Sequence, residues 1–291
     1  MNQKHGHSLA EDLSLIQEQL LGRRQALRLM ALSGAATLLP GCGGGGSDTS
    51  TTIITPVVST TPVTPTTPTE TTASCVVSST ETNGPYPADG TNTSSGSTSN
   101  VLSLASAVRS DIRSSFLNTS TVAPGVRVDL TIKLVNVRNA CSALTSHAIY
   151  LWQCDAQGRY SLYDLPTESY LRGIQVTDGN GQVAFTTIFP GAYAGRYPHI
   201  HFEVFSSLAN ASNGRNSLLV SQLALPSAQS QDVYTDTSIY GSSGSRFPQT
   251  PIASDNVFRD NTAAQITQQT IALSGSRSTG YTGTVLVGVN V

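Results

Sequence analysis

The chain has 291 residues, of which only 12% are charged, and its formal net charge is −2. A chain of this length can form one large domain or two small ones. It carries no basic cluster outside the N-terminus, so it lacks the positive surface typical of nucleic-acid binding proteins. The composition favours a neutral or small anionic ligand.

Residues 1–42 are predicted to form an export signal rather than part of a fold. Arg23-Arg24 precede a moderately apolar run over 30–39, which is too short to cross a membrane as a helix. The twin arginines favour the Tat route, which exports folded proteins. Leu39-Pro40-Gly41-Cys42 resembles a lipobox, in which the cysteine is acylated. We therefore expect an exported protein, periplasmic or anchored to the cell envelope by a lipid on Cys42.

Residues 43–74 are predicted to form a linker. The segment begins with four glycines and continues in Ser, Thr and Pro, with Thr-Pro pairs at 55–56, 61–62, 64–65 and 67–68. Such a composition buries too little apolar surface to offset the entropy of ordering the chain, and repeated proline keeps it extended. The folded domain is therefore expected over 75–291.

Residues 75–291 are predicted to form a single all-β domain, an antiparallel β-sandwich with irregular loops. Val128, Leu130, Ile132 and Leu134 alternate with polar residues, which is the period of a half-buried strand. Further strands are predicted at 147–153, 182–188, 199–205, 218–225 and 283–291. No long amphipathic helix competes with this interpretation.

Three cysteines remain if Cys42 is acylated, namely Cys75, Cys141 and Cys154. Outside the cytoplasm, one disulfide among them is expected, with one thiol left over. The sequence does not choose the pair.

The stretch from Arg196 to His201 concentrates a guanidinium, a phenol and two imidazoles. In an extended strand, His199 and His201 share one face, whereas Ile200 and Phe202 share the other. The apolar face can enter a core while both imidazoles approach one metal ion. A His-x-His pair can also be a surface or structural feature, but the chain has only five histidines, so a pair beside Arg196 favours a metal site.

A three-ligand zinc or ferrous site is one alternative, with Glu203 joining His199 and His201. A strand advances roughly 6.6 Å every two residues, so three successive residues on one face reach a single ion awkwardly. That site would also leave the nearby tyrosines unexplained.

Several motifs occur in order between residues 83 and 202. They are Asn83-Gly84-Pro85-Tyr86-Pro87, Arg109 to Arg113, Leu151 to Tyr160, Tyr170 to Gly173, Thr177-Asp178, Phe185 to Ile188, Pro190-Gly191-Ala192-Tyr193 and Arg196 to Phe202. Together they resemble the intradiol ring-cleavage dioxygenases, the family of the catechol and protocatechuate dioxygenases. The resemblance covers most of 75–225.

The resemblance implies a non-haem Fe(III) ion held by two tyrosinates and two histidines. By motif position, these ligands are Tyr160, Tyr193, His199 and His201. Tyr163 competes with Tyr160 for one of these places, and spacing favours Tyr160. Phenolate is a hard anionic ligand that stabilises ferric over ferrous iron, and two phenolates offset much of the metal's charge.

The resemblance also implies the reaction. A catechol-type ring would bind through both oxygens, react with O2, and open between its two hydroxylated carbons to a muconate-type diacid. Tyr193 is expected to leave the metal and accept a proton, while Arg196 stabilises negative charge on the ring. Gln222 is expected to line the same pocket. Arg196 could instead pair with Glu203 or another acid.

A non-enzymatic alternative also exists. Similar turn motifs occur in transthyretin-like β-sandwich modules, which bind or adhere without catalysis and lack the Arg-x-x-His-x-His ending. The loops that would choose among catechols, 86–126 and 206–217, do not reveal the substrate.

Overall fold

The computed structural model describes residues 75–291. The predicted export signal at 1–42, with Cys42, and the predicted linker at 43–74 lie outside the described residues. None of the helices within 75–291 is long and apolar enough to cross a membrane.

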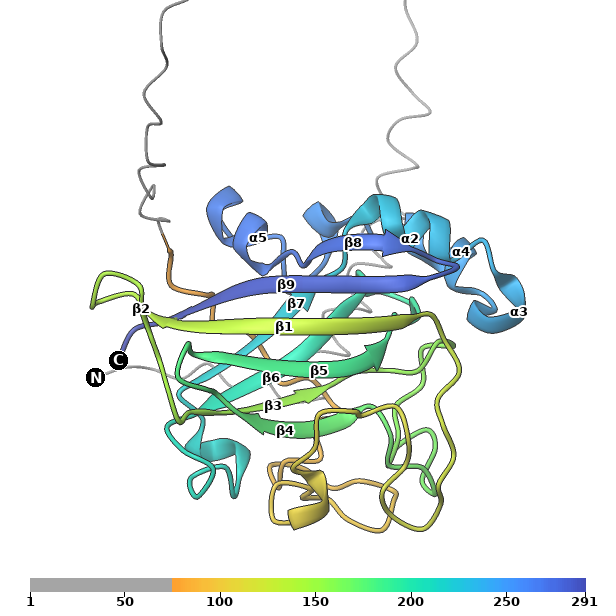
Figure 1. Ribbon diagram of the computed structural model, residues 1–291. Helices are drawn as coiled ribbons and strands as arrows, with labels where there is room; N and C mark the ends of the chain where they lie inside the picture. The colour runs from red at the N-terminus through yellow and green to blue at the C-terminus, as the bar shows by residue number, and fades with distance from the viewer. Residues whose placement is uncertain (1–74) are drawn as a thin grey trace, which may run out of the picture. The chain divides into compact units, whose positions relative to one another are not determined.

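In the part of the chain that the structure describes, nine strands form two sheets (Figure 1). The strands are β1 Arg127–Asn136, β2 Ser142–Ala143, β3 Ala148–Trp152, β4 Arg172–Val176, β5 Gln182–Ile188, β6 His199–Phe205, β7 Leu219–Ala224, β8 Ala272–Ser276 and β9 Gly280–Val289. One sheet has the order β2-β1-β9-β8, with β5 also paired to β1, and the other has the order β4-β3-β6-β7. The predicted all-β sandwich is confirmed.

The helices are short and irregularly spread between the strands. They are α2 Ser227–Val233, α3 Thr237–Tyr240, α4 Ser243–Arg246 and α5 Ala263–Gln269, with 3-10 turns η2 Ala105–Ala107, η3 Gly214–Asn216, η4 Phe247–Gln249 and η5 Ile252–Ser254. Within residues 75–291, all four α-helices follow β7, and Figure 1 shows them near the β8 side of the fold.

The structure differs from the sequence prediction in two ways: it contains three additional strands, and one strand pair is parallel. β2, β4 and β8 were missed, because β2 has two residues and the other two contain glycine and lack clean alternation. β9 runs parallel to β1, although every strand was expected to be antiparallel. The reason is that the chain leaves β7 through the helical excursion and returns as the β8–β9 hairpin, which places β9 beside β1 in the same direction.

Strand β6 is buried on both faces along its whole length. Its apolar face, with Ile200, Phe202 and Val204, enters the core between the sheets, where it joins the buried residues of β1. Its other face belongs to a second buried layer with Trp152 and Tyr150. The alternation along β6 therefore separates an apolar core from a layer that contains polar side chains.

The second layer is covered by residues 75–126, which we call the entry segment. This segment precedes β1 and contains little regular structure (orange to yellow in Figure 1). The backbone N–H of Glu81 donates to Val220 of β7, and that of Arg109 donates to Ile174 of β4. The entry segment thus crosses the outer face of the second sheet from one edge strand to the other.

A disulfide joins Cys75 to Cys141. It connects the first described residue of the entry segment to the turn between β1 and β2, 66 residues later in the sequence. Among the described residues, Cys154 is the remaining thiol, and it is buried. Burial raises the pKa of Cys154, so this cysteine is a neutral, inert thiol rather than a nucleophile.

Removing the disulfide in Cys75→Ser/Cys141→Ser is expected to lower the free energy of unfolding by about 2–4 kcal/mol, because the cross-link restricts the unfolded chain. Urea unfolding with and without reductant measures this. Reductant should destabilise the unsubstituted protein and leave the double variant unchanged. Equal stability of the two proteins without reductant would contradict the prediction.

Candidate active site

His199 and His201 stand on the covered face of β6, near the end where the strand begins. In the sheet register, His201 lies between Trp152 of β3 and Gln222 of β7. The indole of Trp152 stacks on the His201 ring at 4.9 Å between centroids and 9° between planes. Both histidines are 2% exposed, so the strand holds two imidazoles out of bulk water.

Tyr160 reaches the same place from the loop after β3. The backbone N–H of Tyr160 donates to Asp164, and the turn before it is tied together by Asp155 and Arg159. Tyr163 lies close in sequence but its hydroxyl donates to Asn92 and accepts from the backbone N–H of Ala88. The loop therefore directs Tyr160, and not Tyr163, toward the histidines.

Tyr193 arrives from the loop between β5 and β6. Gly191 in this loop lies against the preceding turn so closely that a Cβ would approach the carbonyl oxygen of Ala156 to 2.3 Å. Only glycine permits that contact. The tight packing of the two loops brings both tyrosines to the same side of β6.

The four side chains form a closed ring of polar atoms, which we call the tyrosine–histidine cluster. His199 Nε2 lies 3.0 Å from His201 Nε2 and 3.0 Å from the Tyr193 hydroxyl. Tyr160 closes the ring, with its hydroxyl 3.1 Å from His201 Nε2 and 3.4 Å from the Tyr193 hydroxyl. The four residues come from one strand and two loops of the fold.

Burial keeps all four groups neutral when no cation is present. It raises the pKa of Tyr160 and Tyr193 above the usual range of a phenol. Burial, followed by the positive charge of Arg196, lowers the pKa of His199 well below its usual value, and burial and neighbouring His199 do the same to His201. The imidazoles therefore carry free lone pairs, and the phenols would ionise only beside a positive charge.

The ring of atoms fits a metal ion. Nitrogen and oxygen ligands about 2.0–2.1 Å from one ion, separated by right or tetrahedral angles, lie roughly 2.9–3.4 Å apart, as the cluster atoms do. His199 Nδ1 lies 2.6 Å from the carbonyl oxygen of Tyr197, so that nitrogen donates and Nε2 is left with its lone pair facing the cluster. The buried Nδ1 of His201 has no hydrogen-bond partner among residues 75–291.

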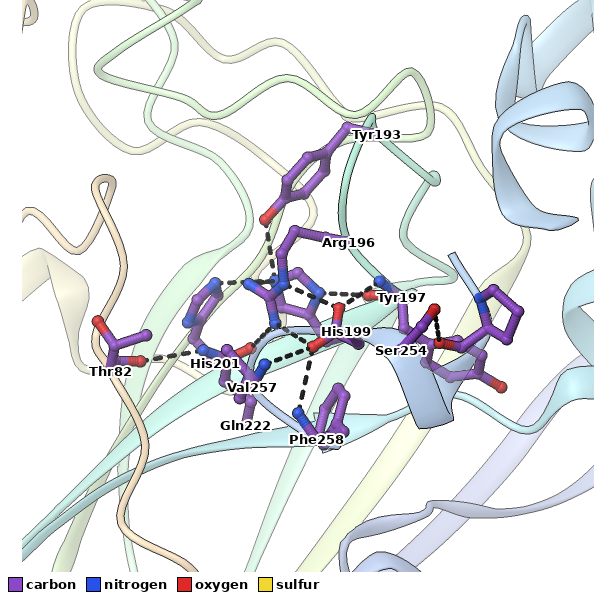
Figure 2. A network of polar contacts seen from close by, with 12 residues as sticks. Thr82, Tyr193, Arg196, Tyr197, His199, His201, Gln222, Ser254, Val257 and Phe258 are labelled. Carbon is purple, nitrogen blue, oxygen red and sulfur yellow. Dashed lines mark hydrogen bonds and ion pairs between the residues drawn. The ribbon is translucent and has the colours of Figure 1, made fainter. Parts of the chain in front are cut away.

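Arg196 lies directly beside the cluster (Figure 2). Its Nη1 lies 3.4 Å from His199 Nε2, and its Nη2 donates to Gln222 Oε1 at 2.5 Å. The Gln222 amide donates in turn to the carbonyl oxygen of Thr82 in the entry segment. Arg196 and Gln222 thus form one network next to the histidines.

The acid that neutralises Arg196 is Asp255, not Glu203. Arg196 Nε donates to the Asp255 carboxylate at 3.0 Å, and Asp255 is fully buried just after η5. The same carboxylate accepts from the backbone N–H groups of Tyr197, Val257 and Phe258. Sequence reasoning missed Asp255 because it stands 59 residues away in an irregular loop, and no local pattern marked it.

The entry segment closes another side of the cluster. Gly84 packs against His201, where an added Cβ would lie 3.2 Å from the ring, and the positive φ of Gly84 also favours glycine. Tyr86 stacks on Tyr160 with 4.6 Å between ring centroids. The Asn-Gly-Pro-Tyr-Pro motif signalled this segment, although its contact with His201 and Tyr160 was not predicted.

Glu203 follows the histidines on the same face of β6 but does not join the cluster. No N–H or O–H donor within 75–291 reaches its carboxyl, whose neighbour is the buried Asp89. Burial and this second acid raise the pKa of Glu203 well above its usual value. Among the described residues, no group of three or more His, Cys, Asp and Glu is placed to hold a metal.

A pocket of about 600 Å3 opens beside the cluster, with Tyr193 and Tyr86 in its wall. A larger hollow of about 790 Å3 lies near α5, β8 and β9 and contains none of the cluster residues. The smaller pocket is the candidate substrate site, because a reacting molecule must reach the polar groups of the cluster.

Comparisons with known proteins find similarity to dioxygenases. The family model described as Dioxygenase matches residues 105–229. The chain is similar in structure to an intradiol ring-cleavage dioxygenase from Tetranychus urticae, with 25% identity, a TM-score of 0.55, and coverage of 74% of this chain and 95% of that one. A second dioxygenase structure gives 25% identity, a TM-score of 0.54 and the same coverage. No curated protein matches the chain. The family-model match and these structural neighbours are dioxygenases, in agreement with the resemblance of the chain's motifs to the intradiol ring-cleavage dioxygenases.

Proposed function

We propose that this protein is a non-haem Fe(III) dioxygenase that cleaves a catechol-type ring between its two hydroxylated carbons with O2, giving a muconate-type diacid. The observation that carries the proposal is the convergence of two phenols and two imidazoles at 3.0–3.4 Å in a buried ring beside a pocket. The match to the dioxygenase family model and the structural similarity to an intradiol ring-cleavage dioxygenase support the same reaction class.

The proposed ligands are Tyr160, Tyr193, His199 and His201. Two anionic phenolates favour ferric iron, and their charges reduce the cost of burying a trivalent ion. When bound, the iron would hold the two catechol oxygens and make the ring electron-rich enough to react with O2. The protein's own contribution is to orient the ring, exclude water and move protons.

Tyr193 is the proposed base because it faces the pocket. Its side chain is half-buried and lines the pocket wall, whereas Tyr160 is fully buried and lies behind it. A phenolate at the pocket wall can accept a proton from an incoming catechol hydroxyl. Tyr160 has no such access and is proposed to remain a fixed ligand.

Arg196 is proposed to stabilise negative charge that develops on the ring. Asp255 and Gln222 hold its guanidinium on one side, while Nη1 faces the cluster at 3.4 Å from His199. A charge fixed in this way needs no reorganisation during the reaction. Gln222 therefore has a positioning role, holding Arg196 between the cluster and the entry segment.

The two alternatives make different predictions for colour. A zinc site or a transthyretin-like binding module would leave the protein colourless, whereas tyrosinate bound to Fe(III) absorbs visible light. Glu203 neighbours Asp89 rather than the tyrosine–histidine cluster, and no group of three or more His, Cys, Asp and Glu within 75–291 is placed to hold a metal, which argues against the three-ligand zinc or ferrous site. A colourless, iron-replete protein would refute the proposed ligand set.

We also propose that the protein acts outside the cytoplasm, as an exported protein with a Tat-type signal and a lipid anchor at Cys42. The Cys75–Cys141 disulfide supports this location, because disulfides persist mainly in oxidising compartments. The signal residues lie outside the described part of the chain.

His199→Ala is expected to lower bound iron by more than about tenfold and to abolish the visible band, because one ligand is removed. Metal analysis and absorption spectra of purified protein measure this. His147→Ala is the matched control, since the His147 ring is hydrogen-bonded to the carbonyl oxygen of Thr145 and lies outside the cluster. Normal iron content in His199→Ala would contradict the proposed site.

Tyr193→Phe is expected to reduce kcat for a catechol by roughly 10²–10⁴-fold, because the base at the pocket wall is lost. Oxygen uptake measures turnover, and the visible band should shift because one tyrosinate is missing. Tyr163→Phe serves as the control and should keep the band of the unsubstituted protein, since its hydroxyl faces Asn92. Unchanged turnover in Tyr193→Phe would exclude this residue as the base.

Arg196→Gln is expected to retain iron and colour but to lower kcat by roughly 10²–10³-fold, because the fixed positive charge is removed while all four ligands remain. Spectra and oxygen uptake separate these effects. Arg127→Gln, which breaks the exposed Arg127–Asp129 ion pair, is the control for loss of an arginine. Loss of iron in Arg196→Gln would contradict this prediction and show that Arg196 is needed for iron binding instead.

A further inference from the structure

The wall of the candidate substrate pocket contains three charged residues, Arg159, Asp164 and Arg246. Two of them are already engaged. Arg159 donates from both Nε and Nη2 to the buried carboxylate of Asp155, and Asp164 accepts from the backbone N–H of Tyr160. The Arg246 guanidinium makes no hydrogen bond or ion pair within residues 75–291.

The backbone that carries Arg246 is held in place by its neighbours. Arg246 is the last residue of α4, whose first residue, Ser243, is buried and accepts a hydrogen bond from the backbone N–H of Ala192 at 3.0 Å. On the other side of Arg246, the ring of Phe247 packs against Tyr197. Because Ala192 directly precedes Tyr193, the helix that carries Arg246 is tied to the loop that carries the proposed base.

The pocket therefore contains one arginine without an ion-pair partner within residues 75–291. The charge of Arg159 is offset by Asp155 beneath it, whereas Arg246 is partly buried and has no acidic partner among the described residues. The pocket volume of about 600 Å3 is typical of sites for molecules larger than one bare ring. A ring whose hydroxyls face Tyr193 thus leaves room for a substituent.

We propose that Arg246 binds a carboxylate substituent of the substrate, so that the preferred substrates are catechols carrying an anionic group. The planar guanidinium fork matches a carboxylate with two parallel hydrogen bonds. Arg159 cannot take this role, because its Nε and Nη2 already donate hydrogen bonds to the Asp155 carboxylate. The proposal names the substrate class of the proposed dioxygenase and rests on that function.

The test compares 3,4-dihydroxybenzoate with its methyl ester, which has nearly the same shape but no charge. Anaerobic calorimetry measures binding of both to the purified iron-loaded protein, and oxygen uptake measures kcat/KM. We expect the acid to be preferred by about tenfold or more, and Arg246→Gln to remove most of that preference. Arg246→Lys should retain part of it, because the charge remains but the fork is lost.

Arg138→Gln is the matched control. Arg138 is exposed and lies just after β1, at the opposite end of that strand from Arg127. Arg127 pairs with Ile188 of β5, whose carbonyl oxygen accepts a hydrogen bond from Gln153, the residue after Trp152. This variant should keep the preference for the acid. An equal affinity for acid and ester, or an unchanged preference in Arg246→Gln, would overturn the inference.

The outcomes also separate the two proposals. Oxygen uptake with both compounds and no charge preference refutes the role of Arg246 and leaves the dioxygenase proposal intact. Charge-selective binding that depends on Arg246, without oxygen uptake from either compound, refutes the proposed reaction and supports the anion site.

Discussion

Burial of β6 on both faces is the constraint on which the rest of the structure depends. An ordinary sandwich strand shows one face to water, and two histidines on that face would be hydrated. Here the entry segment covers the outer face, with Gly84 against His201 and Tyr86 against Tyr160. The imidazoles consequently remain neutral, and the phenols of the cluster can ionise only beside a cation. The proposed metal site results from covering a strand that would otherwise face solvent.

A second consequence of this burial is that a charged residue beside the cluster needs a partner. Arg196 is 10% exposed, and an arginine buried without an acid would be strongly destabilising. Asp255 supplies the negative charge and also accepts three backbone N–H groups, so the loop around η5 folds about its carboxylate. The ion pair therefore holds together the strand with the histidines and the excursion that follows β7, while leaving one edge of the guanidinium free for chemistry.

The same excursion shapes the open side of the site. Ser243 fixes α4 to the backbone just before Tyr193, and Arg246 extends from that helix into the pocket wall. The segment that neutralises Arg196 and the segment that supplies Arg246 are thus neighbours in sequence, between β7 and β8. The residues proposed to react come from the sandwich and its short loops, whereas the residue proposed to select the substrate comes from this later insertion.

The sequence by itself determined those features that depend on residues close together in the chain. Alternation along β1 and β6 predicted strands and their apolar faces, and the resemblance of the motifs to the intradiol dioxygenases pointed to Tyr160, Tyr193, His199 and His201. Tertiary structure alone decided the Cys75–Cys141 pair, the parallel direction of β9, and the partnership of Arg196 with Asp255. Each of these joins segments far apart in the chain. A side chain's periodicity is fixed by the backbone geometry of its own strand, but its distant partner is fixed only when separate segments pack against one another.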